Sequence, residues 1–354
     1  MKLDPPAHQP SSGSPLQGGE KPPLLSVRHL STDFVSVDRT IAHALEDVSF
    51  DVVPGQTLGL VGESGCGKTT TLLSVMRLLP VSASISGQAF YKGTDLLLLS
   101  EREMRSYRWK EMAIVFQGAM NALNPVTRVG DQIREPILLH KLMDQAAADK
   151  QVEKLLDLVG IAKNRKDQYP HQYSGGMRQR AMIAMALACQ PSLLFADEPT
   201  TALDVMIQAQ VLELLKQIQQ ALGLAIVLVT HDLGVVAEVC DAVVVMYGGK
   251  VAEYGSADQV YNQPQHPYTQ RLLESFPDIN RPNETLACIP GTPPRLSDLP
   301  PGCRFEPRCH KKIDICARVT PRLVDVSASE AGTSLQIRQV ATCHLLNGTE
   351  VRNL

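Results

Sequence analysis

The chain has 354 residues, more than the roughly 100 to 200 residues typical of one domain. Its 34 Lys and Arg residues against 37 Asp and Glu residues give a formal net charge of −3. This balance argues against a general nucleic-acid-binding protein, because neutralising phosphates needs a basic surface. Hydrophobic residues make up 44% and charged residues 20%, which excludes global disorder. The longest uncharged, mostly apolar stretch, 181–189, is far shorter than the ~20 residues that cross a bilayer.

Residues 1–23 carry six prolines among Ser and Gly and little apolar content, so we predict a disordered leader. They lack a basic region followed by an apolar core and a cleavage site, so we expect no secretory signal and a cytosolic address. In the cytosol, the eight cysteines are not expected to form a disulfide framework. Any clustered set of cysteines is therefore interpreted as metal-binding or incidental.

The first predicted elements are strands over 25–34 and 44–53, followed by a strand over 57–61 that leads into a glycine-rich turn. A helix follows this turn over 70–79. The stretch from about 120 to 190 is predicted to be mostly helical. Within 144–159, apolar residues recur at helical spacing, and the next residue, Gly160, suits a C-terminal cap.

Further along, a strand over 193–196 precedes a long helix with an apolar face, and a strand over 225–229 follows. This alternation predicts a largely parallel sheet covered by helices. Residues 242–246 and 251–254 flank two glycines and predict a hairpin near the edge of that sheet. From about Pro264 the composition becomes proline-rich, which predicts a smaller, irregular C-terminal domain.

A phosphate-binding loop is the first chemical motif. Residues 62–69 read Gly-Glu-Ser-Gly-Cys-Gly-Lys-Thr, which fits G-x-x-x-x-G-K-[ST] between a predicted strand and a predicted helix. Glycines let backbone N–H groups surround phosphate oxygens, and the helix N-terminus favours negative charge. In this pattern Lys68 reaches the β- and γ-phosphates and Thr69 binds Mg²⁺.

Two carboxylates at the end of the strand over 193–196 form the second motif. Such a pair can divide its work: Asp197 would hold Mg²⁺, and Glu198 would polarise the water that attacks the γ-phosphate. Alone this pattern is weak, because strand-ending acids are also common solvated caps. Together with the phosphate loop it predicts a nucleotide-hydrolysing site.

The segment 174–180, Ser-Gly-Gly-Met-Arg-Gln-Arg, precedes an apolar helix and resembles the signature sequence of ATP-binding-cassette (ABC) ATPases. Other landmarks of that family stand in the family's order: Gln117, the segment 201–204, and His231. The resemblance implies an α/β P-loop NTPase fold with a RecA-like core, a helical subdomain over about 120–190 and a small irregular C-terminal domain. The implied divisions are 24–263 for the ATPase domain and 264–354 for the C-terminal domain.

The resemblance also assigns site residues. Implied contacts with the nucleotide of the same chain come from Phe34, Gly62, Ser64, Gly65, Cys66, Gly67, Lys68, Thr69 and Thr70. Implied Mg²⁺ contacts come from Thr69, Gln117 and Asp197, and implied catalytic residues are the base Glu198 with Gln117 and His231. Implied contacts with the nucleotide of a second cassette come from Ser174, Gly175, Gly176 and Asp204. For stacking on adenine, His43 is the alternative to Phe34, and Phe34 can instead serve the core.

Within the family, several segments resemble the dipeptide, oligopeptide and nickel importer branch. They are Val61–Gly65, Met120–Pro125, His266–Thr269, Ile289–Pro294 and Gly302–Cys309. The resemblance implies a motor at the cytoplasmic face of the membrane that pairs with a second, related ATPase chain. It further implies two membrane permease subunits and an extracytoplasmic peptide-binding protein as partners, and no nucleic acid.

Four cysteines gather near the end of the chain with the spacing C-x5-C-x6-C-x26-C; they are Cys303, Cys309, Cys316 and Cys343. This spacing is looser than the paired C-x2-C of zinc ribbons. Four thiolates can hold a [4Fe-4S] cluster or a tetrahedral Zn²⁺, and the resemblance favours the cluster. The third interpretation is that the four cysteines are reduced, structural and bind no metal.

Alternative functions follow from the same motifs. The cargo can be a dipeptide, a longer peptide, a nickel chelate or glutathione, because selectivity in such importers lies in other subunits. A soluble ABC ATPase acting in DNA repair or on ribosomes would usually show two cassettes or a long coiled-coil insertion, and neither is apparent here. An exporter or drug-resistance cassette is the remaining alternative.

Overall fold

The computed structural model describes residues 22–118, 122–201, 203–275, 288–327 and 337–346. Most of the leader predicted over 1–23 lies outside these ranges. The strands form two sheets, of order β2-β1-β4-β5 and β11-β12-β10-β9-β3-β8-β7-β6. The first sheet comprises β1 (Leu25–Val35), β2 (Ile41–Val52), β4 (Ala83–Tyr91) and β5 (Thr94–Asp95). The second comprises β3 (Thr57–Val61), β6 (Met112–Val115), β7 (Leu193–Asp197), β8 (Ala225–Thr230), β9 (Ala242–Tyr247), β10 (Lys250–Ser256), β11 (Leu323–Asp325) and β12 (Val340–Thr342).

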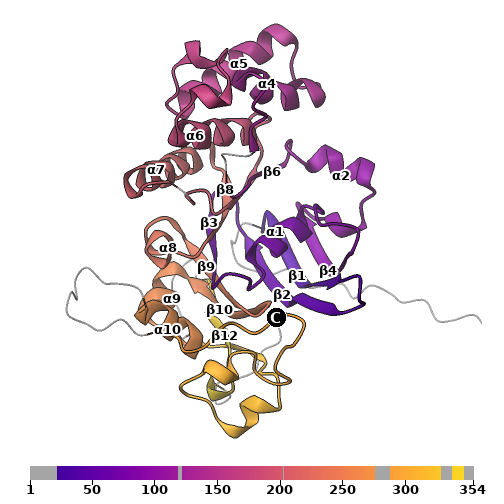
Figure 1. Cartoon of the computed structure of the whole chain (residues 1–354), viewed down its shortest axis with the longest axis vertical. Coiled ribbons are helices and arrows are strands. Elements are labelled where there is room, and N and C mark those ends of the chain that lie inside the picture. Colours follow the sequence, from indigo (N-terminus) through magenta and orange to yellow (C-terminus); the bar gives the residue numbers. More distant parts are fainter. Residues whose placement is uncertain (1–21, 119–121, 202, 276–287, 328–336, 347–354) are drawn as a thin grey trace, which may run out of the picture.

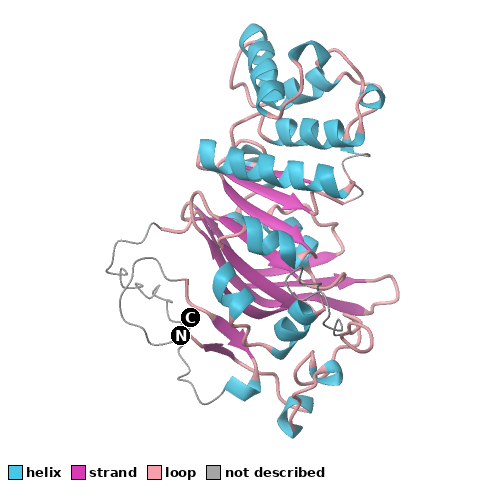
Figure 2. Cartoon of the chain, turned by 90° about the vertical axis from the view of Figure 1, so that its left-hand side faces the viewer, coloured by secondary structure: helices cyan, strands magenta, loops and turns pink. Residues whose placement is uncertain are grey.

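Helices cover both faces of the second sheet and gather at one end of the molecule (Figures 1 and 2). Along the first half of the chain they are α1 (Lys68–Val75), α2 (Glu101–Tyr107), α4 (Val129–Leu139) and α5 (Gln145–Leu158). Along the second half they are α6 (Gly175–Ala186), α7 (Val205–Leu222), α8 (Leu233–Val239), α9 (Ala257–Asn262) and α10 (Pro267–Glu274). The predicted alternation of strands and helices is confirmed.

The second sheet is parallel from β6 through β7, β8 and β3 to β9, and then antiparallel through β10, β12 and β11. Every residue of β7 is buried, because apolar layers cover both faces. Leu193 and Phe195 of β7 join one hydrophobic cluster, with α1 and the first sheet. Leu194 and Ala196 join the other, with α6 and α7. The largely parallel, covered sheet predicted from the sequence is confirmed.

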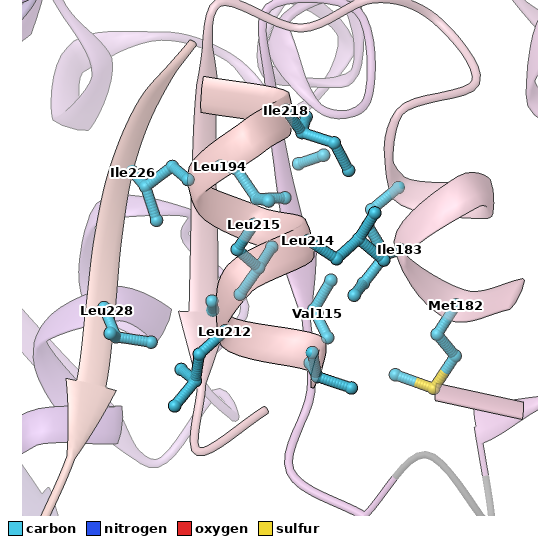
Figure 3. Packing of buried hydrophobic residues seen from close by; sticks show 14 of the residues in the cluster. Val115, Met182, Ile183, Leu194, Leu212, Leu214, Leu215, Ile218, Ile226 and Leu228 are labelled. Carbon is cyan, nitrogen blue, oxygen red and sulfur yellow. The ribbon is translucent and has the colours of Figure 1, made fainter. Parts of the chain in front are cut away.

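Helix α7 connects the sheet to the helical end of the molecule. The Asp204 side chain caps its first turn, and Gly223, with φ of 62°, ends it. Its apolar face lies against β7 and β8, while Leu214 lies toward Ile183 of α6 (Figure 3). The side chains of α7 shown there, together with Leu194 and Ile226, thus link the sheet to the layer of α4, α5 and α6.

The helix predicted over 144–159 is confirmed as α5, with Asp144 as its N-terminal cap. Gly160 follows the helix in the left-handed conformation, with φ of 72°. The predicted apolar face is buried against the rest of the helical layer. Helices α4, α5 and α6 therefore supply the helical segment expected over about 120–190, of which 119–121 lie outside the described residues.

The predicted hairpin of β9 and β10 is present, but its predicted place near the sheet edge is wrong. Strand β10 pairs with β12 through Glu253–Ala341 and Tyr254–Val340, and β11 lies beyond β12. Strands β11 and β12 are three residues long each, too short to produce a visible alternation of apolar and polar residues. The end of the described chain therefore extends the main sheet (Figure 1).

Candidate active site

The phosphate loop lies between β3 and α1 in a conformation that requires glycine. Gly62 and Gly67 have φ of 146° and 106°. A Cβ on Gly62 would collide with the carbonyl oxygen of Met246, and one on Gly67 would lie 2.8 Å from the carbonyl oxygen of Ala44. Lys68 is buried, and its Nζ donates to the carbonyl oxygens of Gly62 at 2.7 Å and of Glu63 at 3.0 Å.

A cavity of about 620 Å³ opens beside this loop. It is lined by Phe34, Ala44, Ser64, Gly65, Gly67, Lys68, Thr69, Thr70, Gln117, Glu198, His231 and Leu296. Phe34, Ala44 and Leu296 supply apolar groups, while the phosphate loop supplies backbone N–H groups and a cation. The cavity can therefore take a ligand with an apolar ring system and a polyanionic chain.

Glu198 is the centre of a polar network in this cavity. Its Oε2 accepts hydrogen bonds from Gln117 Nε2 at 2.7 Å and from Thr201 Oγ1 at 2.9 Å. Its Oε1 lies 3.3 Å from His231 Nδ1. Glu198 has φ of 44°, a costly value for a residue with a side chain, and such strain concentrates at functional sites. The structure thus brings together the three side chains that the resemblance assigns to catalysis.

Asp197 lies at the end of β7, beside the phosphate loop. Its side chain is almost fully buried, and Thr69 Oγ1 donates to its Oδ1 at 3.1 Å. Burial raises the pKa of Asp197, although the hydrogen bond from Thr69 opposes this shift. A carboxylate, a hydroxyl and the nearby Gln117 amide are hard oxygen donors of the kind that Mg²⁺ prefers, so these residues fit that ion.

The residues assigned to a second cassette lie elsewhere. Ser174 and Asp204 cap the N-termini of α6 and α7 and accept from the backbone N–H groups of Met177 and Ile207. A Cβ on Gly176 would lie 2.8 Å from the Ile207 side chain, so the two helix N-termini are adjacent. None of Ser174, Gly175, Gly176 and Asp204 lines the cavity. Ser174 and Asp204 are exposed and the two glycines are partly exposed, so the four residues form a surface apart from the cavity.

Two of the residues assigned to the loop lie outside the cavity lining. They are Gly62, the first residue of the loop, and Cys66, which is buried with its Sγ 3.8 Å from Lys68 Nζ. Of the two residues considered for adenine, Phe34 lines the cavity, whereas His43 pairs through Nδ1 with Asp33 at 2.7 Å. Sequence reasoning missed Leu296, whose carbonyl oxygen accepts from the His43 N–H at 2.9 Å.

The four clustered cysteines meet around one small cavity, which Cys303, Cys309, Cys316, Cys343 and His344 help to line. All four have free thiols. Burial raises the pKa of Cys303 to about 11, and the charges of the other three cysteines add to this effect, so the four groups are close neighbours. Within the described ranges, no group of three or more His, Cys, Asp or Glu residues is arranged to hold a single metal ion.

Among the helices that the structure describes, none combines the length and the apolar character that crossing a bilayer requires.

The glycine-lined phosphate loop, the strand-end acids and the separate surface at α6 define the class of protein: this is an ABC ATPase. The profile of the ABC transporter family matches residues 45–201, and that of the C-terminal region of oligopeptide/dipeptide transporters matches residues 252–316.

The chain belongs to the dipeptide/oligopeptide family of ABC transporter ATP-binding subunits. It is 51% identical to the dipeptide transport ATP-binding protein DppD of Bacillus subtilis over 84% of this chain and 90% of that protein. It is 45% identical to the oligopeptide transport ATP-binding protein OppD of Escherichia coli over 87% and 91% of the two chains.

Solved structures show the same fold. The dimeric ATP-binding cassette MJ0796 in a post-hydrolysis state with ADP and Pi has a TM-score of 0.59 and 25% identity, over 66% of this chain and 98% of that one. CbiO1 from Clostridium perfringens, part of the ABC transporter complex cbiONQ, has a TM-score of 0.59 and 29% identity, over 68% and 91%. The predicted α/β P-loop fold and the predicted family are therefore confirmed.

Proposed function

We propose that this ABC ATPase powers the import of peptides through a membrane transporter. The observation that carries the ATPase chemistry is the position of Glu198, held by Gln117 and near His231 beside the phosphate loop. The peptide cargo is supported by the relatives, which are a dipeptide and an oligopeptide transport protein, and by the matching C-terminal region.

In the proposed reaction, ATP lies along the cavity with its base against Phe34 and Leu296 and its phosphates in the loop. Lys68 and the loop N–H groups neutralise the β- and γ-phosphates. Glu198 accepts a proton from the attacking water, Gln117 positions that water, and His231 contacts the γ-phosphate. Thr69, Asp197 and Gln117 would hold Mg²⁺, which supplies charge stabilisation for the transferred phosphoryl group.

Two cassettes are proposed to complete each site. Ser174, Gly175, Gly176 and Asp204 lie apart from the cavity of their own chain, so they are free to meet the γ-phosphate bound by a partner. The partner is proposed to be a second, related ATPase chain, as the resemblance implies. The similar MJ0796 cassette is itself dimeric with ADP and Pi, which supports this arrangement. Closure on ATP and reopening after hydrolysis would drive two permease subunits.

The motor is proposed to sit at the cytoplasmic face of the membrane, beneath permeases that receive peptides from an extracytoplasmic binding protein. Reconstitution tests this directly: the chain, its partner ATPase, both permeases and the binding protein are placed in proteoliposomes with a labelled dipeptide and a labelled longer peptide. ATP-dependent uptake of either peptide supports the proposal. Uptake of a nickel chelate or glutathione in place of peptides would contradict the proposed cargo.

We also propose that the four cysteines hold a [4Fe-4S] cluster. A single zinc ion needs four thiolates at ~2.3 Å, and the described residues contain no such arrangement, whereas a four-iron cluster needs thiolates that surround a larger volume. What supports the proposal is that all four cysteines line the same cavity, so one group could bind all four thiolates. Bound there, the cluster would cross-link turns that have few apolar contacts.

Anaerobic purification tests the cluster. Iron and sulfide near four per chain, with visible absorbance that C316S removes, are expected. Zinc in stoichiometric amount, or a colourless protein without iron, would contradict it. As a proposal on domain organisation, the ATPase domain spans 24–263 and the cysteine-containing domain spans 264–354.

A further inference from the structure

The phosphate loop contacts the C-terminal segment, residues 288–346, through Glu63, a residue that the ATPase mechanism does not use. Glu63 stands second in the loop, directly after Gly62, and its carboxylate receives two hydrogen bonds from Arg308. Arg308 Nη1 lies 2.6 Å from Glu63 Oε2, and Arg308 Nη2 lies 3.0 Å from Glu63 Oε1. This is a bidentate ion pair between residues 245 positions apart in the chain.

The pair is sheltered from water on the arginine side. The Arg308 side chain is 6% exposed, and that of Glu63 is 24% exposed. Burial disfavours the charged guanidinium, but the hydrogen bonds to Glu63 outweigh it, so the pKa of Arg308 is raised. A sheltered charge-assisted pair is worth more than an exposed one, and loss of one partner leaves the other uncompensated.

The remaining donors of Arg308 bind fixed parts of the C-terminal region and β9. Its Nε donates to the carbonyl oxygen of Pro290 at 2.7 Å, and its Nη1 also donates to Tyr247 Oη at 3.2 Å. Arg308 therefore connects the segment 289–290 and β9 to the phosphate loop. A guanidinium offers five donors in a fixed planar fork, whereas the three donors of a lysine share one nitrogen and cannot form the bidentate pair with Glu63 while reaching Pro290 and Tyr247.

The backbone of Glu63 is held as well. Its N–H donates to Tyr268 Oη of α10 at 2.9 Å. Lys68 Nζ donates to the carbonyl oxygens of Gly62 and of Glu63 itself. The peptide between Gly62 and Glu63 is thus bonded at both its N–H and its C=O. Because a peptide group is planar, these two hydrogen bonds fix its orientation. They thereby set the direction in which the chain enters the rest of the loop, whose N–H groups face the phosphates.

Tyr268 is itself firmly placed. It is fully buried and packs on Phe305 and Tyr247 with ring centroids 5.3 and 4.6 Å apart. Its N–H donates to His266 Nδ1, and the N–H of His266 donates to the buried carboxylate of Glu253 at 2.9 Å. The segments 266–269, 289–290 and 302–309, which have no part in the ATPase chemistry, therefore converge on one loop residue.

We propose that Arg308 and Tyr268 are positioning residues for the phosphate loop, and that through Glu63 the C-terminal segment sets the affinity of this ATPase for the triphosphate of ATP. This inference rests on the proposed function, since it assumes that the loop binds ATP. Arg308 also balances a carboxylate that would otherwise repel the phosphates.

The test measures binding of trinitrophenyl-ATP to the full chain by fluorescence, with Mg²⁺ present. R308A is expected to raise Kd about tenfold, and R308K about threefold. K312A is the matched control, because it removes another cation of the same segment, which pairs with Glu306 at 3.0 Å away from the loop. K312A is expected to leave Kd unchanged.

A double mutant separates positioning from general damage. If Arg308 acts through Glu63, R308A/E63Q binds no more weakly than R308A, because the second change removes an uncompensated charge. Hydrogen exchange of the loop amides at 63–69 is expected to accelerate in R308A and not in K312A. Independent effects that multiply in the double mutant would overturn the proposal.

Should R308A fail to fold, Y268F and R308K decide. Y268F keeps the ring and removes only the acceptor for the Glu63 N–H, and a Kd raised about threefold supports the proposal. Unchanged Kd in both variants would overturn it. Wild-type protein that binds no ATP analogue would instead contradict the proposed function, so the two failures are distinguishable.

Discussion

The ATPase core and the C-terminal segment at 288–346 are built in different ways. In the core, strands such as β7, β8 and β9 are buried along their whole length, and helices cover them on both sides. In the C-terminal segment, the described residues form short 3-10 turns and two three-residue strands. Its buried side chains include Arg304 and Arg308, which pair with Glu46 and Glu63 of the core.

This difference shows two ways of fixing a chain in place. The core assembles from apolar residues at regular spacing. Burial of apolar side chains on both faces of a parallel sheet is non-directional, so it does not require a specific partner for each residue. The C-terminal segment relies on specific pairs, since a buried guanidinium is stable only beside its carboxylate. We therefore expect changes at the core's catalytic residues to affect chemistry, and changes in the segment to affect nucleotide affinity and the stability that its packing gives to the core.

The largest effect is expected at Glu198. E198Q removes the base but keeps an amide that can still accept from Gln117 and Thr201, so ATP binding is retained. Turnover of the assembled transporter is expected to fall by about 10² to 10⁴-fold. Phosphate release measures the rate, and ATP-analogue binding is the control. Turnover within threefold of wild type would show that another group acts as the base.

Phe305 tests whether the C-terminal segment stabilises the core. It is 2% exposed, and its ring lies 5.1 Å from that of Tyr247. F305A is expected to lower the free energy of unfolding by about 3 to 5 kcal/mol, through lost contacts and a cavity. Chemical denaturation measures this, with V319A, at a 47% exposed position, as control. Equal losses in the two variants would mean that the segment packs loosely on the core.

Glu46 tests the second ion pair between the two regions. Glu46 binds buried Arg304 and also Lys250 at 2.6 Å, and despite the opposing effect of burial these cations lower the pKa of Glu46. E46Q is expected to cost about 1 kcal/mol at pH 7, because Arg304 loses its counter-charge.

The pH dependence of Glu46 follows from the sign of its shift. A lowered folded-state pKa gives stability that is present above the ordinary value of 4.5 and is lost as pH falls through the folded value. The stability difference between wild type and E46Q should therefore shrink below about pH 4.5. The control E274Q removes an exposed pair with Arg271 and should change little. A difference that grows on acidification would contradict this reading.

The smallest effect is expected at Leu296, the one C-terminal residue that lines the nucleotide cavity among those described. L296A should raise Kd for the ATP analogue by about threefold, because it removes apolar contact with the base. The rate at saturating ATP should not change. L98A, at an 84% exposed position, is the control. An unchanged Kd in L296A would place the base elsewhere in the cavity.

The sequence predicted the part of the site that depends on local patterns. The loop at 62–69 and the two acids at the end of β7 are predicted from consecutive residues, and the structure places Glu198 beside Gln117 and His231. Leu296 and Arg308 carry no such local signal, because their roles depend on contacts with residues over 200 positions away. Arg308 stands in the segment Gly302–Cys309, which resembles a branch of the family, and Leu296 lies outside every segment that carries the resemblance.

The fold, like the site, was predicted only where it depends on local sequence patterns. The strands and helices of the core follow from periodicity over five or more residues. Strands β11 and β12 could not be found in this way, and the edge of the sheet was consequently misplaced. Strand β12 exists because β10 offers unpaired N–H and C=O groups, which is a property of the assembled sheet rather than of residues 340–342.

The pairing of β12 with β10 has a consequence for biosynthesis. As the chain leaves the ribosome, the core through β10 can assemble before Val340–Thr342 have been translated. Until then β10 offers an open edge on which another nascent chain can add a strand, so incomplete chains are exposed to aggregation. Termination before residue 340 would leave that edge permanently open. The truncated chain would keep the residues of the phosphate loop but would be prone to aggregate through β10.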